Sequence, residues 1–361
     1  MITSRFNHIK VAGIACCVPT MADDLSIYRT VFDDETVDKF QKSTGVHKRH
    51  VSKKEQTASD LAFVAAEKLL VEKEIEKDSI GALLFVSECP DYHSPATAFV
   101  LQKRLGLSLD CIVFDINLGC SAFIYGLSTL ASLMTTSNIN RALLLFGDTM
   151  TKYVAPKDKA ACMLFGDAGG AVLLEKDDSA GEMCFRFKSD GYNYKTVLIQ
   201  GGGFRYPDAP TERVLWGDGN YRSDHDFYMD GANVFSFSTF EAPALIKAHM
   251  EEEGTKTEDY DALLLHQANQ FIINRIGKRL KFPPEKVICS ITEYGNTSGA
   301  SIPVAAVSAF GEITGRKLHI LSCGFGVGLS WGTAEFFVRS DDILPMIYSD
   351  DCYGDGIISH G

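Results

Sequence analysis

The segment CIVFDINLGCSAFIYGL (residues 111–127) decides how this chain is interpreted, because it joins an apolar run directly to a run of small and apolar residues. The apolar residues of 112–116 predict a buried strand, and the run after Cys120 predicts a helix. Cys120 would then stand at a helix N-terminus, where unpaired backbone N–H groups and the helix dipole favour a thiolate. The alternative is one more buried thiol among the ten cysteines, but only Cys120 lies at such a Gly-Cys-Ser junction.

Two further segments suit a reactive thiol. His266 follows an apolar run in LLLHQANQF, and Asn296 lies in the Gly-bounded turn EYGNTSGASIP. Taken singly, His266 could be a satisfied histidine at a strand end and Asn296 an ordinary left-handed turn residue. Gln267 and Asn269 favour a functional histidine, because their side chains could fix the ring by hydrogen bonds. Together with Cys120, these side chains fit nucleophilic acyl transfer.

The chain also repeats itself. Residues 79–148 and 259–322 share a pattern: IGALLFVSE matches YDALLLHQA, and QKRLGLSLDCIVFDI matches GKRLKFPPEKVICSI. The repeat predicts two α/β halves, 1–180 and 181–340, with strands buried on both faces and an acidic tail, 341–361, outside the core. Ligands bind at the carboxyl ends of parallel strands, so the cysteine, histidine and asparagine should meet at a shared centre.

Composition excludes several classes of function. The chain has 361 residues, 45% hydrophobic content and a formal charge of −12, which predicts a large core and no nucleic-acid or membrane partner. The ten cysteines form no CxxC pair and no cluster with zinc spacing. We therefore expect no metal, no cofactor and a reducing cytoplasmic location.

Two glycine-rich stretches have different interpretations. GFGVGLSW (324–331) could be a plain hairpin turn, or it could aim a backbone N–H at a developing oxyanion, which requires an approach that a side chain would block. GGG at 201–203 lacks the strand–helix context of a phosphate loop and indicates flexibility. It lies in the long stretch 190–231, which we expect to be functional or mobile.

The motifs NLGCSAF, LFGDAGGAVLL, HQAN, GNTSGASIP and GFGVGLSWGTA, in this order, resemble the β-ketoacyl-acyl carrier protein synthase III family of the thiolase superfamily. The resemblance covers residues 1 to about 340. It implies the thiolase-like α/β fold, two duplicated halves in αβαβα layers. It also implies decarboxylating Claisen condensation of an acyl group with a malonyl thioester, in fatty-acid or specialised lipid and polyketide metabolism.

The resemblance implies a role for each motif residue. Cys120 would carry the acyl group, while His266 and Asn296 would stabilise the enolate left by decarboxylation. Backbone N–H groups of Cys120 and Gly328 would form the oxyanion hole, and Asn269 would orient His266. Neutral donors suffice for this chemistry, because decarboxylation makes a carbanion without a strong base.

The resemblance also implies partners: acyl carrier protein, acyl-coenzyme A thioesters, or both, and a second copy of the chain in a homodimer that covers an apolar surface near residues 85–120. The family's housekeeping members place a Trp and an Arg against the coenzyme A nucleotide, where this chain has Lys39 and Ser43. Lys159 retains a basic contact, and Phe40 could supply a substitute ring. A carrier protein could instead dock on the basic residues after HQAN, unless these form only a solvated helix face: Arg275, Lys278, Arg279 and Lys281.

Two rival classes remain. One is an acyltransferase of the same fold that forms an ester or amide without a carbon–carbon bond. The other is a non-catalytic acyl-binding or scaffold protein, against which the retained cysteine argues. A hydrolase would need a base to activate water, and no Asp or Glu accompanies the three motifs; Asp167 is expected to hold a turn.

Overall fold

Each half of the repeat contributes the central strands of one six-stranded mixed sheet in the computed structural model, which describes residues 2–354 and 356. The first sheet has the order β18-β2-β8-β7-β5-β6, and the second has the order β1-β9-β17-β16-β14-β15. The strands of the first sheet are β2 (Ile9–Val18), β5 (Ile80–Val86), β6 (Ile112–Ile116), β7 (Arg141–Asp148), β8 (Ala168–Lys176) and β18 (Ile347–Tyr348). Those of the second are β1 (Ile2–Phe6), β9 (Met183–Ser189), β14 (Ala262–Leu265), β15 (Val287–Ile288), β16 (Lys317–Gly326) and β17 (Ser330–Arg339).

The two sheets repeat one topology. β5 lies between β6 and β7 and is parallel to both, just as β14 lies between β15 and β16 and is parallel to both. β8 and β17 then pair antiparallel with β7 and β16. The prediction of a duplicated α/β unit is confirmed. The boundary near residue 180 stays a prediction: β1 of the first half joins the second sheet, and β18 of the predicted tail joins the first.

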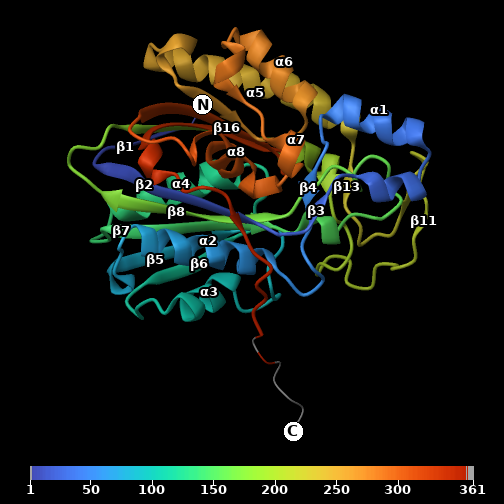
Figure 1. Ribbon diagram of the computed structural model, residues 1–361, viewed down its shortest axis with the longest axis horizontal. Coiled ribbons are helices and arrows are strands. Elements are labelled where there is room, and N and C mark those ends of the chain that lie inside the picture. The colour runs from blue at the N-terminus through green and yellow to red at the C-terminus, as the bar shows by residue number, and fades with distance from the viewer. Residues whose placement is uncertain (1, 355, 357–361) are drawn as a thin grey trace.

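Helices separate and cover the two sheets (Figure 1). α4 (Ala122–Thr135) and α8 (Ser301–Phe310) pack between the sheets, with contacts to strands of both. α2 (Ala58–Glu72) and α3 (Thr97–Leu105) cover the outer face of the first sheet, and α5 (Gly231–Glu253) covers that of the second with α6 (Gln270–Leu280) packed beside it. The predicted αβαβα layering is therefore confirmed. Within the described part of the chain, no helix has the length and apolarity needed to cross a bilayer.

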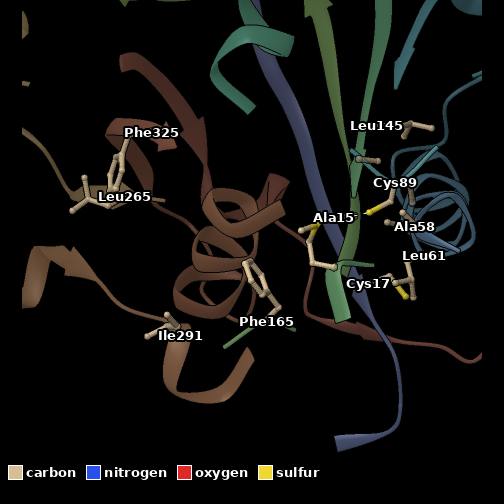
Figure 2. Packing of buried hydrophobic residues seen from close by; sticks show 14 of the residues in the cluster. Ala15, Cys17, Ala58, Leu61, Cys89, Leu145, Phe165, Leu265, Ile291 and Phe325 are labelled. Carbon is tan, nitrogen blue, oxygen red and sulfur yellow. Dashed lines mark hydrogen bonds between the residues drawn. The ribbon is translucent and has the colours of Figure 1, made fainter. Parts of the chain in front are cut away.

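The central strands are apolar without interruption because both of their faces are covered. Alternate side chains of β5 enter two hydrophobic clusters: Ile80, Leu83 and Phe85 face the outer helices, and Ala82, Leu84 and Val86 face α4. Figure 2 shows part of the outer cluster, where Ala15 and Cys17 of β2 lie beside Ala58 and Leu61 of α2.

The remaining elements are short. The helices among them are α1 (Asp34–Thr44) and α7 (Ile291–Tyr294). The strands are β3 (Ala22–Asp23), β4 (Arg49–His50), β10 (Val197–Leu198), β11 (Val214–Leu215), β12 (Tyr221–Arg222) and β13 (Tyr228–Met229). The 3₁₀ turns are η1 (Ser26–Thr30), η2 (Lys77–Ser79), η3 (Met150–Lys152), η4 (Gly191–Thr196), η5 (Thr257–Asp259), η6 (Pro284–Lys286), η7 (Ser298–Ala300) and η8 (Ser340–Asp342). The long stretch 190–231 thus has its own framework. Arg222, buried within it, pairs with Asp158 at 2.5 Å and with Asp218 at 2.7 Å.

The expectation that the acidic tail lies outside the core is wrong for its first part, around Ile343 and β18, whereas residues 351–354 are exposed. Ile343 is buried, and β18 adds a parallel strand to β2. Gln56 Nε2 then donates to the carbonyl oxygens of Ser349 and Asp351 at 3.0 and 3.2 Å. The last part of the predicted tail, 355 and 357–361, lies outside the described residues.

Candidate active site

Cys120, His266 and Asn296 line one cavity of about 120 Å³. Cys120 follows β6 and His266 follows β14, at the carboxyl ends of the two sheets' parallel strands. Asn296 lies in the turn before η7. Residues far apart in the sequence thus meet where the duplication predicts a shared centre.

Cys120 is positioned by the turn that begins at the end of β16. A Cβ on Gly326 would lie 2.5 Å from Cys120 Sγ, and a Cβ on Gly324 would lie 2.8 Å from Ser121 Cα. Ser121 Oγ and Ser330 Oγ lie 2.7 Å apart and tie the start of α4 to β17. Gly324 and Gly326 are therefore required by close approach to the Cys120 segment, whereas a Cβ on Gly328 would lie nearest to Ser330 of its own turn.

Replacing Gly326 with alanine should abolish most acylation of Cys120, because the new methyl group would occupy space beside the sulfur. We expect acyl transfer from an acyl thioester, measured by intact-protein mass spectrometry, to slow by about 100-fold, the scale of a misplaced reacting group. Gly217→Ala is the matched control, since nothing lies within 4 Å of its Cβ position. Equal acylation rates in the two variants would contradict this account of the turn.

Burial decides the protonation of Cys120. It raises the pKa of the thiol to about 12, and the nearby Glu88 carboxylate adds to the rise, while a backbone hydrogen bond from Val327 lowers the pKa. The prediction that the helix N-terminus yields a resting thiolate is therefore wrong: desolvation of the charged form outweighs the backbone donors. Cys120 rests as a thiol near neutral pH, so its proton must leave as the sulfur attacks.

The backbone donor beside the sulfur belongs to Val327, whereas the role of Gly328 at the oxyanion stays a prediction. Val327 lines the cavity and its N–H bonds the Cys120 sulfur, whereas Gly328 is absent from the described lining. Gly328 has φ of +131°, which turns the chain away after Val327. Which of these adjacent N–H groups faces Cys120 depends on the shape of the turn, and the motif alone does not specify it.

His266 is buried and its ring is neutral. Burial lowers the pKa of the imidazole to about 3, against a rise from a backbone hydrogen bond with Ser298. Nδ1 lies 2.7 Å from Ser301 Oγ, and the ring meets Phe325 edge-on with centroids 5.5 Å apart. A neutral imidazole held in this way suits a hydrogen-bond role at the thioester, not that of a permanent charge.

The residues predicted to fix the His266 ring have other partners among residues 2–354 and 356. Gln267 Nε2 donates to the Leu265 carbonyl at 2.7 Å, and Gln267 Oε1 accepts from the Ser290 N–H at 2.9 Å. Asn269 caps α6, where its Oδ1 accepts from the Ile272 N–H at 2.8 Å. Asn269 lines the cavity, but Ser298 and Ser301, not Asn269, contact the His266 ring.

Asn296 is buried and its amide is oriented by its own turn. Oδ1 accepts from the Ser298 N–H at 2.9 Å, and the backbone bonds to Leu164 and Gly166 at 2.9 and 3.1 Å. With Oδ1 held, Nδ2 is the group left to donate to a ligand in the cavity.

An acidic pair, Glu88 and Asp148, lies beside Cys120 and was missed from the sequence. Glu88 lines the cavity, and burial together with the Asp148 charge raises its pKa to about 8. The prediction that no acid accompanies the motifs is therefore wrong. The duplication could have indicated this acid. Glu88 follows β5, which is the counterpart of β14, and His266 follows β14. Asp167 does hold a turn as predicted, since its carboxylate accepts from Ser52 and Thr151.

Most of the remaining cavity wall is apolar, with Ser238, Asn269 and Ser298 as its polar members. The stretch 190–231 contributes Val197, Phe227 and Met229 to this wall, and a functional role for the stretch stays a prediction. Such a wall suits a hydrocarbon acyl chain. The apolar lining residues are Met150, Leu164, Phe165, Val197, Phe227, Met229, Val234, Phe235, Ile272 and Phe325.

The positions that match the family's coenzyme A contacts lie on α1 and near it. Lys39 and Ser43 are exposed, but Phe40 is buried in the core, so it cannot supply the substitute ring. Lys159 is exposed, with Nζ 6.0 Å from the centroid of the Phe32 ring.

The predicted docking patch lies in and just after α6, and all of its members are exposed: Arg275, Lys278, Arg279 and Lys281. Within the described chain, only Cys184, His249 and Glu253 bring three potential metal-ligand atoms within 4.8 Å of one another. They do not line the cavity, and both His249 nitrogens already pair with Thr333 and Glu335.

Comparisons with known proteins agree with this geometry. Residues 114–191 match the family 3-oxoacyl-[acyl-carrier-protein (ACP)] synthase III, and residues 250–336 match its C-terminal region. A β-ketoacyl-[acyl-carrier-protein] synthase III of Clostridium perfringens is 37% identical over 303 residues, which span 83% of this chain and 90% of the relative.

Solved structures show the same relationship. The 3-oxoacyl-(acyl-carrier protein) synthase of Burkholderia xenovorans LB400 superposes with a TM-score of 0.91 at 36% identity, over 96% of this chain and 99% of that one. The corresponding synthase III of Pseudomonas aeruginosa PAO1 has a TM-score of 0.79 at 27% identity, over 94% and 99% of the two chains.

Proposed function

The chain belongs to the 3-oxoacyl-[acyl-carrier-protein] synthase III family of condensing acyltransferases, and we propose that it joins an acyl group held on Cys120 to a malonyl thioester. Carbon dioxide leaves and a β-ketoacyl thioester forms, a condensation that initiates fatty-acid biosynthesis. The observation that carries this proposal is the meeting of Cys120, His266 and Asn296 in one largely apolar cavity.

The reaction has two halves. In the first, Cys120 attacks an acyl thioester through a tetrahedral oxyanion that accepts hydrogen bonds from the N–H groups of Cys120 and Val327. The C–S bond to the carrier breaks, and the departing carrier sulfur takes up the proton that Cys120 loses and leaves as a thiol. In the second, the malonyl thioester loses carbon dioxide, and the carbanion attacks the acyl-cysteine carbon and expels the Cys120 thiolate. His266 and Asn296 donate to the enolate oxygen, which a buried neutral imidazole and an amide do without an added charge.

His266→Ala and Asn296→Ala should separate the two halves. Both variants should still take an acyl group on Cys120, but decarboxylation of malonyl donor should slow by roughly 10²–10³-fold, the effect of losing one oxyanion-type donor. Release of labelled carbon dioxide measures the second half, and the mass of the acyl-enzyme measures the first. Condensation at the unmodified rate in both variants would refute these roles.

The same assay separates the rival functions. A condensing enzyme yields carbon dioxide and a ketone from labelled malonyl carrier protein, whereas an ester- or amide-forming transferase yields neither. A non-catalytic protein would leave Cys120 without an acyl group.

An acyl carrier protein is an acidic partner, and the basic patch is close enough to the cavity to receive it. α6 carries the patch, and its first turn is part of the cavity wall through Asn269 and Ile272. Arg275 also lies over the ring of Phe235, which lines the cavity, with its guanidinium carbon 5.8 Å from the ring centroid. A carrier docked on α6 could therefore deliver a thioester to Cys120 along a short path.

Lys278→Glu should weaken acylation from carrier protein more than acylation from coenzyme A. We expect the ratio of the two rates to fall about tenfold at low salt and the difference to shrink as salt rises, because exposed charges are screened. Lys247→Glu, an exposed site on α5, is the control. A preference for coenzyme A that neither salt nor Lys278→Glu alters would contradict docking at this patch.

A homodimer is the second part of this proposal. β6 is the edge strand of the first sheet, and its outer ladder has no partner in the described chain. Apolar side chains are exposed nearby: Ile112 is 46% exposed, Phe99 is 49% exposed and Leu109 is 95% exposed. An open edge flanked by such residues is usually covered, and a second copy of β6 would cover it.

Light scattering at micromolar concentration should give the mass of two chains, since obligate interfaces of this kind bury over roughly 2,000 Å². Ile112→Lys should shift the protein towards the monomer by placing a charge at the edge. Leu215→Lys, at an exposed leucine on β11, should leave the mass unchanged. A monomeric unmodified protein would exclude the dimer.

A further inference from the structure

We propose that Glu88 gives this site a second, non-decarboxylating reaction: transfer of the acyl group from Cys120 to a hydroxyl acceptor, with the Glu88 carboxylate as proton acceptor. The proposal rests on the acylation of Cys120 set out above. It starts from a carboxyl group that the condensation mechanism does not use.

The Glu88 carboxyl group lies against the segment that carries the nucleophile. A Cβ on Gly119 would lie 2.1 Å from Glu88 Oε2, so the absence of a side chain at the residue before Cys120 is what admits the carboxyl group. Glu88 also lines the cavity together with Cys120, His266 and Asn296. An acid placed there faces the same ligand as the thiol.

In the part of the chain that the structure describes, the Glu88 carboxyl group has no hydrogen-bond donor or cation bound to it. Its neighbour Asp148 takes the available donors, accepting from Ser87 Oγ at 3.0 Å, the Glu88 N–H at 2.8 Å and the Gly299 N–H at 3.1 Å. Among residues 2–354 and 356, no hydrogen bond or ion pair is made by either Glu88 side-chain oxygen. A structural carboxylate would have such partners, whereas a proton-transfer group must be free to meet its substrate.

A hydroxyl acceptor needs a proton-accepting group, because it loses a proton as it attacks. A malonyl donor does not need one, because it loses carbon dioxide. As the hydroxyl oxygen attacks the thioester carbon, its proton passes to Glu88, an O–C bond forms, the C–S bond breaks and Cys120 leaves as thiolate. Glu88 then returns the proton to Cys120, so the acyl-cysteine and the alcohol become an ester and the free thiol with no net change at Glu88. A neutral amine attacks without prior loss of a proton, so the base selects for hydroxyl groups, and the apolar cavity wall disfavours water as a competitor.

His266 is a poor alternative base, because its imidazole is strongly desolvated and binds a proton weakly. Glu88 is matched to neutral pH, since a base works best when its pKa lies near the operating pH and burial raises the Glu88 pKa to about 8. The titratable groups that interact electrostatically with Glu88 are Asp148 on β7, Cys120 before α4, Cys89 after β5 and Tyr153 after η3. The active form is the carboxylate, so ester formation should rise with pH and level off above about 8.

The experiment loads Cys120 first and then offers a hydroxyl. The protein is incubated with straight-chain acyl groups of two to twelve carbons, presented on coenzyme A and in parallel on acyl carrier protein, and intact mass identifies the chain that acylates Cys120. The acyl-enzyme then receives 1-butanol or malonyl-coenzyme A, and the butyl ester and the β-ketoacyl product are measured from pH 6 to 9. We expect butyl ester from the unmodified protein, and a ratio of ester to condensation product about 100-fold lower in Glu88→Gln, without the rise towards pH 8. Glu55→Gln, at an exposed glutamate, is the matched control and should keep the unmodified ratio.

The possible failures are distinguishable. No acyl group on Cys120 with any thioester would overturn the proposed function, and this inference with it. Normal acylation without butyl ester, or the same ester-to-condensation ratio in Glu88→Gln, would overturn this inference alone. Formation of a β-ketoacyl product from two acyl thioesters without malonyl donor would also overturn this inference. Glu88 would then remove a proton from the α-carbon of a thioester and not from a hydroxyl group.

Discussion

The contact between Gly326 and Cys120 is the constraint on which the site depends. Cys120 lies between β6 of the first sheet and α4, whereas Gly326 ends β16 of the second sheet. The backbone of the second half must therefore reach the thiol of the first. Only a residue without a side chain permits it, because a Cβ at Gly326 would lie 2.5 Å from the sulfur. The Val327 N–H follows directly and bonds the same sulfur, so one close approach both brings the halves together and supplies a backbone donor.

Desolvation then sets the protonation states of Cys120, His266 and Glu88. It keeps Cys120 a thiol, keeps His266 a neutral imidazole and raises the pKa of Glu88 towards neutral pH. All of these effects have one cause, which is that a charge is costly where water is excluded. The same exclusion strengthens the hydrogen bonds on which decarboxylation depends, since donors act more strongly in a low dielectric. Asp148 tolerates its place beside Glu88 because three donors converge on it.

Much of the fold and the central site could be predicted from the chain alone. Apolar runs such as 80–86 require strands buried on both faces, and repetition of the pattern at 260–265 implies a second copy of the same unit. Since parallel strands direct their carboxyl ends to one edge, the positions of Cys120 and His266 within their segments were enough to bring them together. These inferences succeed because they depend on local periodicity and strand direction, both of which the residues themselves set.

What the sequence could not decide lies in contacts between segments with no fixed spacing. The resemblance implies Gly328 as an oxyanion donor, but the path of the turn determines which N–H meets the sulfur, and here it is that of Val327. Glu88 was overlooked for the same reason: its carboxyl group matters only because it packs beside Gly119, on a neighbouring strand end. The protonation of Cys120 likewise follows from the depth of its burial and not from its place at a helix start. Local patterns therefore determined the fold and the meeting of Cys120, His266 and Asn296, whereas packing distances and desolvation, which exist only once the two halves meet, decided the protonation states, the backbone donor beside the sulfur and the position of the unpaired acid.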